Sequence, residues 1–315
     1  QLDTADDLYK KENWIKANPI LEYDEDALEN LVPIANTARD MGGEDLRDFL
    51  VKQLNMWMQW SNALYIKDIK DWKRCAALRT LKDSRGSKCY VGVDLSSGGD
   101  LTSIAIVIPY MVDGVKKYFV HTHSFIPASR VDEHIKTDKV PYDVWISKGL
   151  VTVTETLGGI KTDYKYIIKY LEDLIKQNDL KPQLVCYDPH NASAFLSDLE
   201  ALGFDSVAIT QTAKELNDAT VDFRLEIKAG NVVIEGTEVG KGKVVPFDEL
   251  LTWSIANAKT ISNSYGEIKI DKALDEDRID PIDAIIDAWK AAMKEEYKPD
   301  TNEVVNEWLE MYEKY

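Results

Sequence analysis

The sequence predicts an α/β protein whose mixed sheet begins with an antiparallel meander of three strands and continues with alternating strands and helices. Three β-rich runs, at residues 89–95, 103–110 and 117–125, succeed one another with turn-forming residues between them. Helical periodicity at 163–177 then leads to an apolar, strand-like run. An all-helical segment is expected to precede the sheet, because residues 1–85 carry apolar side chains at helical spacing.

The first 85 residues are expected to form a helical unit of their own. Apolar side chains recur at helical spacing at Phe49, Leu50, Leu54, Trp57 and Met58. A further helix is predicted at 66–81. The polar stretch 82–87 is typical of a linker, so the first domain boundary is placed between residues 85 and 86.

The remaining elements continue the alternation. Helices are predicted at 192–202, 213–229, 247–258 and from Asp280 onward, and strands at 151–154, 183–187, 206–209, 231–234 and 266–270. The stretch 236–243 is typical of a hairpin or a flexible loop. A meander followed by alternation is the order of the RNase H-like fold. Residues 86–296 are therefore assigned to an RNase H-like domain, and 297–315 to a C-terminal helical tail.

The composition limits the possible functions. A net charge of -17 argues against binding nucleic acid through bulk charge, although bound metal ions can neutralise the carboxylates of a DNA enzyme. The three cysteines form neither a zinc pattern nor a disulfide framework, which fits a reducing, intracellular setting. There is no apolar run long enough for a membrane span. The chain lacks an initiating Met and is expected to be part of a longer one.

Aspartates stand at the ends of three predicted elements. Asp94 follows the apolar run Tyr90–Val93, and Asp188 follows another such strand. Asp280, Asp283 and Asp287 share one face of the last helix at spacings i, i+3 and i+7. Taken singly, each has a plainer interpretation as a turn former, a helix cap or a solvated charge. Their joint placement is the stronger signal.

These elements are neighbours in an RNase H-like sheet, so their acids should converge. Three converging carboxylates are costly to hold together without a cation. Mg²⁺ or Mn²⁺ prefers such oxygen ligands, and two ions about 4 Å apart would clamp the attacking and leaving oxygens of a phosphodiester. We expect Asp94 to bridge the ions, Asp188 to hold one of them, and Asp280 or Asp283 to hold the other.

Three basic side chains are weaker candidates for DNA contacts. His190 lies close to Asp188 in the sequence and would either contact a phosphate or cap a helix. Lys241 and Lys243 stand beside glycines, where a contact with the DNA backbone and a plain solvated loop are equally compatible with the pattern.

The chain resembles the large subunit of phage terminase, a DNA-packaging motor and nuclease. The stretches that carry the resemblance are Trp14–Pro19, Leu54–Trp57, Val93-Asp94 with Asp100, Tyr187–Ala192, Thr210–Thr212, Leu250–Ala258 and Arg278–Pro281. Together they cover nearly the whole chain in the family's order.

The resemblance implies an endonuclease that cuts double-stranded viral DNA with two divalent metal ions and little sequence preference. The catalytic acids of the family match Asp94, Asp188 and an aspartate of the last helix, either Asp280 or Asp283. It also implies a portal protein and a small terminase subunit as partners, and the host cytoplasm as location. The fragment alone is expected to be monomeric.

Two departures from the family stand out. The pattern Gly-x-x-x-x-Gly-Lys-Ser/Thr is absent from the sequence, and 236–243 does not provide it. We therefore expect the ATP-hydrolysing half to be missing, with residues 1–85 forming a helical linker at its C-terminal end. The second departure is Ile234, where members of the family often carry a histidine.

Three other interpretations remain open from the sequence. A Holliday-junction resolvase or an RNase H proper would use the same kind of acid site. An actin-like kinase also places Asp, Gly and Ser after its first strand, as in Asp94–Gly99, but a second glycine-rich phosphate motif is missing. A non-catalytic docking module of a packaging motor would carry these acids as surface charge.

Overall fold

The computed structural model describes residues 2, 6–41, 48–56, 63–96, 101–155, 158, 162–190, 192–272 and 277–296. The chain divides into two compact units between Lys67 and Asp68. The predicted tail at 297–315 lies outside the described residues, as do Trp57, Met58 and Asp100. In the described part of the chain, no helix combines the length and the apolar character that crossing a membrane requires.

The first unit is helical, as the sequence predicts. It contains α1 (Lys11–Ala17), the short 3₁₀ helix η1 (Pro19–Glu22), α2 (Glu25–Met41) and a single wide turn, η2 (Phe49–Gln53). Trp14 and Phe49 meet edge to face at the centre of its core. The indole N–H of Trp14 donates to the carbonyl of Leu8 at 2.8 Å, so the buried donor has a partner.

Residues 68–85 pack with the second unit, and the helix predicted at 66–81 is wrong beyond Lys73. The segment forms α4 (Ile69–Lys73), the two-residue strand β1 (Ala76–Ala77) and η3 (Leu81–Ser84). Ala76 pairs with Ile234 in a parallel ladder, and the amide of Ile234 donates to the carbonyl of Cys75 at 3.0 Å. Pairing with a distant strand overrides the helical propensity of the alanines.

Nine strands of the described chain form one sheet. Its order is β1-β8-β4-β3-β2-β6-β7, with β5 beside β4 and β9 beside β8. The predicted meander is present as β2 (Lys88–Asp94), β3 (Thr102–Val112) and β4 (Val115–Pro127), all antiparallel. The other strands are β5 (Val151–Thr154), β6 (Lys181–Tyr187), β7 (Ser206–Ala208), β8 (Val232–Glu238) and β9 (Val244–Pro246). β6 runs parallel to β2, which makes β2 an interior strand.

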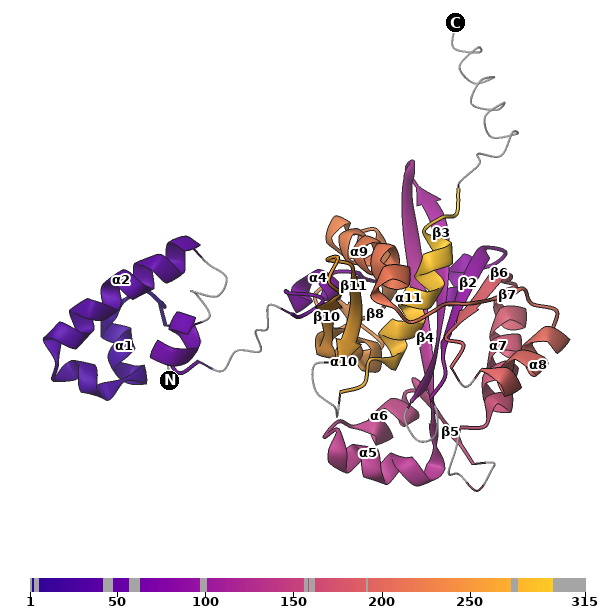
Figure 1. The fold of residues 1–315 in the computed structure, drawn as a ribbon, viewed down its shortest axis with the longest axis horizontal. Coiled ribbons are helices and arrows are strands. Elements are labelled where there is room, and N and C mark those ends of the chain that lie inside the picture. Colours follow the sequence, from indigo (N-terminus) through magenta and orange to yellow (C-terminus); the bar gives the residue numbers. More distant parts are fainter. Residues whose placement is uncertain are drawn as a thin grey trace, which may run out of the picture. The chain divides into compact units, whose positions relative to one another are not determined.

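Helices cover both faces of this sheet (Figure 1). On one face lie α7 (Tyr164–Asn178) and α8 (Ser193–Ala201), packed on Val91 and Val93 of β2. On the other lies α11 (Asp280–Ala292), which packs on β2, β3 and α9 (Ala213–Ala229). The strand alternation therefore turns the even-numbered residues of β2, including Asp94, toward α11.

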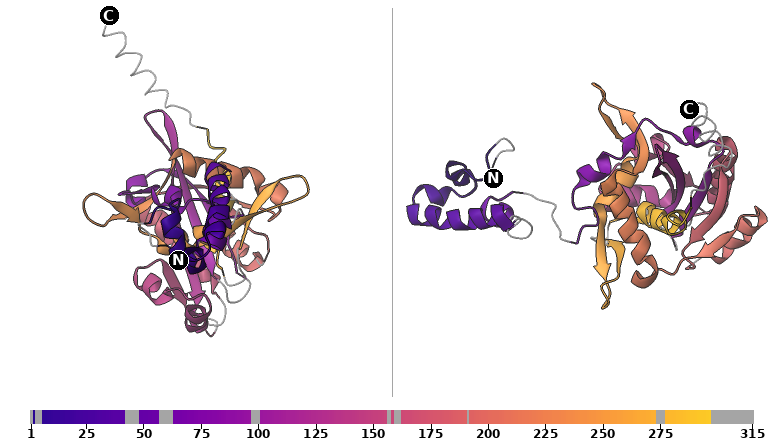
Figure 2. Two further views of the ribbon diagram at one scale, coloured as in Figure 1. Left: turned by 90° about the vertical axis from the view of Figure 1, so that its left-hand side faces the viewer. Right: turned by 90° about the horizontal axis from the view of Figure 1, so that it is seen from above.

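The structure also contains elements that the sequence pattern did not predict. α5 (Val131–Thr137) and α6 (Tyr142–Ser147) occupy the segment before β5. The predicted helix at 247–258 ends one residue early as α10 (Glu249–Asn257), because β10 (Ala258–Ser262) begins there and pairs with β11 (Ile268–Lys272). The β8–β9 and β10–β11 hairpins project on opposite sides of the second unit (Figure 2).

Gly92 lets α11 lie directly on β2. A Cβ atom placed on Gly92 would lie 1.9 Å from the carbonyl oxygen of Ala284 and 2.8 Å from the amide nitrogen of Ala288. Both neighbours are backbone atoms, so no side-chain rotation relieves the clash. The helix backbone itself must move if this residue gains a side chain.

We expect Gly92→Ala to destabilise the fold by about 3 kcal/mol or more, because overpacking against backbone forces the helix off the sheet. Urea unfolding followed by circular dichroism measures the effect. Gly86→Ala is the matched control: Gly86 has φ +77° and open space around its Cβ position, so only the local strain of about 1–2 kcal/mol applies. Equal losses in the two variants would contradict the close approach.

Candidate metal centre

Two strand ends bring the first pair of acids to one edge of the sheet. β2 and β6 are parallel neighbours, and Val93 pairs with Tyr187 at the end of their ladder. Asp94 is the last residue of β2, and Asp188 directly follows β6. Because carboxyl ends of parallel strands open at the same edge, both side chains leave the sheet there.

The last helix brings the other acids to the same place. Asp280 and Asp283 occupy the first turn of α11, with Pro281 next to Asp280, where proline is tolerated because early helix amides have no intrahelical partner. Asp287 lies one turn further on, and only 1% of its surface is exposed. The close contact at Gly92 lays this helix over β2, so that Asp94 faces its first turns.

One pocket of about 200 Å³ collects all four acids predicted as ligands. Its lining is acidic, with two lysines and one glutamine among the carboxylates: Asp94, Asp188, Gln211, Lys269, Ile270, Asp271, Lys272, Ile279, Asp280, Asp283 and Asp287. The structure thus brings together side chains that lie almost two hundred residues apart in the chain. Their role as ligands stays a prediction.

Three acids of this pocket, Asp94, Asp283 and Asp287, have raised pKa values. Burial raises the pKa of Asp94 well above its ordinary value, and the carboxylates of Asp280 and Asp283 raise it further. Burial also raises the pKa of Asp283 well above its ordinary value, and the positive charge of Lys269 opposes this rise. Burial raises the pKa of Asp287 to about 7. A cation placed among these groups would favour their charged forms.

The chemistry of the donor set fits a hard divalent cation, since every acidic ligand offers carboxylate oxygen. Across the described residues, however, no group of three or more His, Cys, Asp or Glu side chains is arranged closely enough to hold an ion. The four acids predicted as ligands nevertheless line one pocket.

Sequence reasoning missed several residues of the pocket. Asp287 continues the acidic face of α11, and that periodicity was the available signal for including it. Gln211 follows β7 and donates from Nε2 to both carboxylate oxygens of Asp287, at 3.0 and 3.2 Å. Lys269 and Asp271 reach the pocket from β11. Gln211 lies within Thr210–Thr212, one of the stretches that carry the family resemblance, but it was not predicted as a site residue. No local pattern marks Lys269 or Asp271, because a hairpin brings them in from elsewhere in the chain.

The weaker candidates lie outside the pocket lining. His190 is exposed, and its amide donates to Oδ1 of Asp188 at 3.0 Å, which ties the loop to that carboxylate. Lys241 and Lys243 are exposed in the turn between β8 and β9. That hairpin projects on the side opposite the β10–β11 hairpin, which lines the pocket (Figure 2). DNA contacts by these three residues stay a prediction.

Comparison with known proteins identifies the family. Residues 1–296 match the model of the terminase large subunit, endonuclease domain. The chain belongs to this family. The terminase large subunit of Enterobacteria phage HK97 is 26% identical over 276 residues, which are 87% of this chain and 50% of that protein. The terminase large subunit of Lactococcus phage p2 is 22% identical over 210 residues, 67% of this chain and 36% of that protein.

A solved structure supports the same assignment. The crystal structure of the HK97 bacteriophage large terminase matches with a TM-score of 0.60 and 26% identity, over 92% of this chain and 56% of that one. The RNase H-like fold predicted from the order of strands and helices is confirmed. This terminase nuclease chain spans about half the length, or less, of the relatives it matches.

A buried ion pair holds the segment that leads into the acidic helix. The guanidinium of Arg278 donates to both carboxylate oxygens of Asp138, at 3.1 and 3.2 Å. Nδ1 of His134 and the hydroxyl of Tyr142 also bond to Asp138, at 3.0 and 2.9 Å. Burial raises the pKa of Asp138, but these bonds outweigh burial and hold the pKa well below its usual range. Arg278 stands two residues before Asp280, so α5 and α6 anchor the start of α11.

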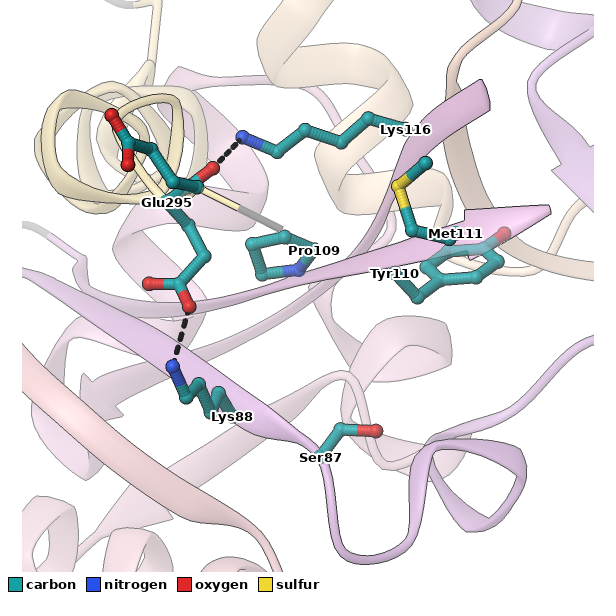
Figure 3. Close-up of a pocket in the computed structure, with 8 residues that line it drawn as sticks. Ser87, Lys88, Pro109, Tyr110, Met111, Lys116 and Glu295 are labelled. Carbon is teal, nitrogen blue, oxygen red and sulfur yellow. Dashed lines mark hydrogen bonds and ion pairs between the residues drawn. The ribbon is translucent and has the colours of Figure 1, made fainter. Parts of the chain in front are cut away.

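A larger cavity, of about 550 Å³, lies at the other end of β2 and β3 (Figure 3). Its lysines already have partners: Lys88 donates to the carboxylate of Glu295 at 2.6 Å, and Lys116 donates to the carbonyl of Glu295 at 2.6 Å. The hydroxyl of Tyr90 bonds to the same carboxylate. These contacts anchor the residues that follow α11 against β2 and the β3–β4 hairpin. They give the cavity a structural role.

We expect Asp138→Asn to cost about 3–5 kcal/mol of folding free energy, because it leaves the Arg278 guanidinium buried without its counter-charge. Glu133→Gln on α5, the helix that ends just before Asp138, is the control. Glu133 pairs with Arg130 at the surface, where solvent screens the pair, so its loss should have little effect on stability. Urea unfolding at neutral pH compares the two variants. A loss of similar size in both would rule out an anchoring role for Asp138.

The raised pKa of Asp287 predicts a pH-dependent stability of the metal-free chain. An unfolded aspartate has a pKa near 3.9, and the folded carboxyl titrates at about 7. The folded state therefore holds the proton more tightly, so this contribution to stability is complete below about pH 4. It is lost as pH rises toward about 7, at up to roughly 1.4 kcal/mol per pH unit.

Asp287→Asn should flatten this dependence, because an amide does not ionise. Thermal melting in EDTA between pH 5 and 8 is the measurement, with Asp173→Asn, at an exposed position of α7, as the control. Wild type and the control should lose stability together as pH rises, while Asp287→Asn loses less. If the melting temperature of Asp287→Asn falls with pH as much as that of wild type, the raised pKa of Asp287 is not the cause of the pH dependence.

Proposed function

We propose that this chain is a metal-dependent endonuclease that cuts double-stranded viral DNA during genome packaging, with little sequence preference. The observation that carries the proposal is the convergence of Asp94, Asp188, Asp280 and Asp283 in one pocket of an RNase H-like fold. Membership in the terminase endonuclease family agrees with it. The acidity of the chain also agrees, since hard cations rather than protein charge would receive the phosphate there.

In this proposal the metal ligands come from the ends of two strands and from the first turn of α11. Asp94, Asp188 and an acid of α11 would hold two ions of Mg²⁺ or Mn²⁺, with Asp94 shared between them. Two such ions would activate a water and stabilise the leaving 3′ oxygen. Asp280 and Asp283 both stand in the first turn of α11, so either could hold the second ion; the family resemblance favours Asp280.

Asp287 would lie next to the ligand acids without holding an ion itself. Its carboxyl accepts two hydrogen bonds from Gln211. In the metal-free chain its raised pKa, about 7, reduces its repulsion of Asp283, its neighbour on the helix. The bond to Gln211 keeps it from swinging toward the ions.

The longer relatives suggest the setting of this activity. Residues 1–85 would form the linker at the end of an ATP-hydrolysing region, residues 86–296 the nuclease, and 297–315 a helical tail. The portal protein and the small terminase subunit are the proposed partners, in the host cytoplasm. His190, Lys241 and Lys243 are proposed to contact the DNA backbone as it enters or leaves.

The first experiment is cutting of supercoiled plasmid with Mg²⁺ or Mn²⁺. Wild type should nick and linearise the plasmid, and Asp94→Asn should lose at least about 100-fold in rate, because metal contacts supply several kcal/mol of transition-state stabilisation. Asp173→Asn should cut like wild type. Cutting that survives in Asp94→Asn would show that another site or a contaminant is responsible.

Metal binding without DNA supplies an independent readout. At an Mg²⁺ concentration 100 times its Kd, one bound ion should stabilise the wild type by about 2.7 kcal/mol. Asp94→Asn should gain much less. If neither protein is stabilised and neither cuts DNA, the chain is either a docking module of a packaging motor, with the acids as surface charge, or a nuclease that needs the ATP-hydrolysing half.

A further inference from the structure

One ammonium group is held inside the acidic pocket. Lys269 lines the pocket, and its Nζ donates to the backbone carbonyl of Gln211 at 3.2 Å. The side chain of the same Gln211 binds Asp287. Lys269 is therefore tied to the loop that also orients a carboxylate. An ammonium has three N–H donors, and this bond uses one of them.

The hairpin that carries Lys269 is firmly placed. β11 pairs along its whole length with β10, and Ile270 between the two pocket-lining residues Lys269 and Asp271 is buried. β11 also packs on α9, where the side chain of Asn217 accepts a hydrogen bond from the amide of Ile268 at 2.9 Å. A side chain on such a strand can be positioned more accurately than one on a free loop.

Charge in the pocket gives this lysine a use beyond packing. Six carboxylates and two ammonium groups, those of Lys269 and Lys272, line the pocket. Two divalent ions carry four positive charges, and the two lysines bring further positive charge to a pocket that six carboxyl groups line. The lysines therefore reduce the repulsion between the pocket and a phosphate. Lys269 lines the pocket together with the acids predicted as ligands.

Its bonding also sets Lys269 apart from a simple counter-charge. In the described part of the chain its ammonium forms no ion pair with a carboxylate, although the pocket is lined with them. Its recorded polar contact is the neutral carbonyl of Gln211. The bond to the Gln211 carbonyl, and not a bond to a carboxylate, therefore fixes the position of the ammonium and of its two other N–H donors.

We propose that Lys269 binds a phosphate oxygen of the DNA strand held in the carboxylate pocket, and so places the backbone against the ligand acids. This contact rests on the proposed nuclease function. Lysine suits it as a compact charge with three rotatable donors. The β10–β11 hairpin would then be the substrate-binding wall of the pocket, and β2, β6 and α11 its ligand-bearing walls.

The test separates a phosphate contact from a counter-charge. Binding of a labelled DNA duplex is measured by fluorescence anisotropy with Ca²⁺ in place of Mg²⁺, from 50 to 200 mM salt. Lys269→Met should bind about 5–10-fold more weakly at the low-salt end, and the slope of log Kd against log salt should fall by about 0.9, as expected for one lost phosphate contact. With Mg²⁺, KM for cleavage should rise more than kcat falls.

Two variants control the result. Lys259→Met makes the same change on β10 outside the pocket lining and should leave affinity and slope near wild type. Lys269→Arg keeps the charge and should restore most of the slope. Mg²⁺ stabilisation without DNA should be at least as large in Lys269→Met as in wild type, since a competing cation has been removed.

Several outcomes would overturn the contact. One is an unchanged DNA affinity and slope in Lys269→Met with strengthened metal binding, which would make the lysine a counter-charge alone. Equal losses in Lys259→Met and Lys269→Met would also contradict it, because the hairpin as a whole would then be responsible. A wild type that cuts DNA alongside either result leaves the nuclease function standing. A wild type that neither binds nor cuts DNA would remove both proposals together.

Discussion

The contact between the backbones of α11 and β2 is the constraint on which the acidic pocket depends. Gly92 has no side chain, and the carbonyl of Ala284 occupies the space where its Cβ would be. Asp94 follows two residues later on the same face of the strand, and Asp283 immediately precedes Ala284 on the helix. A helix held about one side chain further away would carry its acids out of reach of Asp94. The close approach at one glycine thus sets the dimensions of the pocket.

That arrangement has an electrostatic cost. Burial and mutual repulsion raise the pKa of Asp94 and of Asp283, and burial raises that of Asp287 to about 7. Gln211 and Lys269 offset part of this cost with a hydrogen bond and a positive charge. A divalent cation would relieve this repulsion. Because it would bind only the folded state, which creates the pocket, its binding would also stabilise the fold. Metal binding and stability should therefore be linked in this chain.

Rigid anchors at both ends keep α11 in register with the sheet. Before the helix, the buried pair of Arg278 and Asp138 ties the chain to α5 and α6. After the helix, the carboxylate of Glu295 accepts hydrogen bonds from Lys88 and Tyr90 of β2, and its backbone carbonyl accepts one from Lys116. These contacts restrict sliding and rotation of the helix. Ligand acids held on a helix so anchored need little further ordering when a cation or a phosphate arrives.

Most of the acids that line the pocket could be predicted because their signals are local. An apolar run that ends in Asp94, another that ends in Asp188, and acids spaced along one helix face each lie within about ten residues. The order of strands and helices then indicated which of these elements are neighbours, and the meander and the parallel strand β6 formed as expected. The acidic face of the last helix also included Asp287, but the sequence did not reveal that this side chain is buried.

The residues that were missed depend on partners far away in the chain. Ala76 and Ala77 have good helical propensity, yet they form a strand because β8 offers them a ladder. Arg278 and Asp138 are separated by 140 residues, and no local pattern relates them. By itself, the sequence determined the periodicity of the elements and the chemistry at their ends, since both arise within a few residues. Only the tertiary structure decided which distant groups complete the pocket, Lys269 among them, because burial, repulsion and hydrogen bonding act through space.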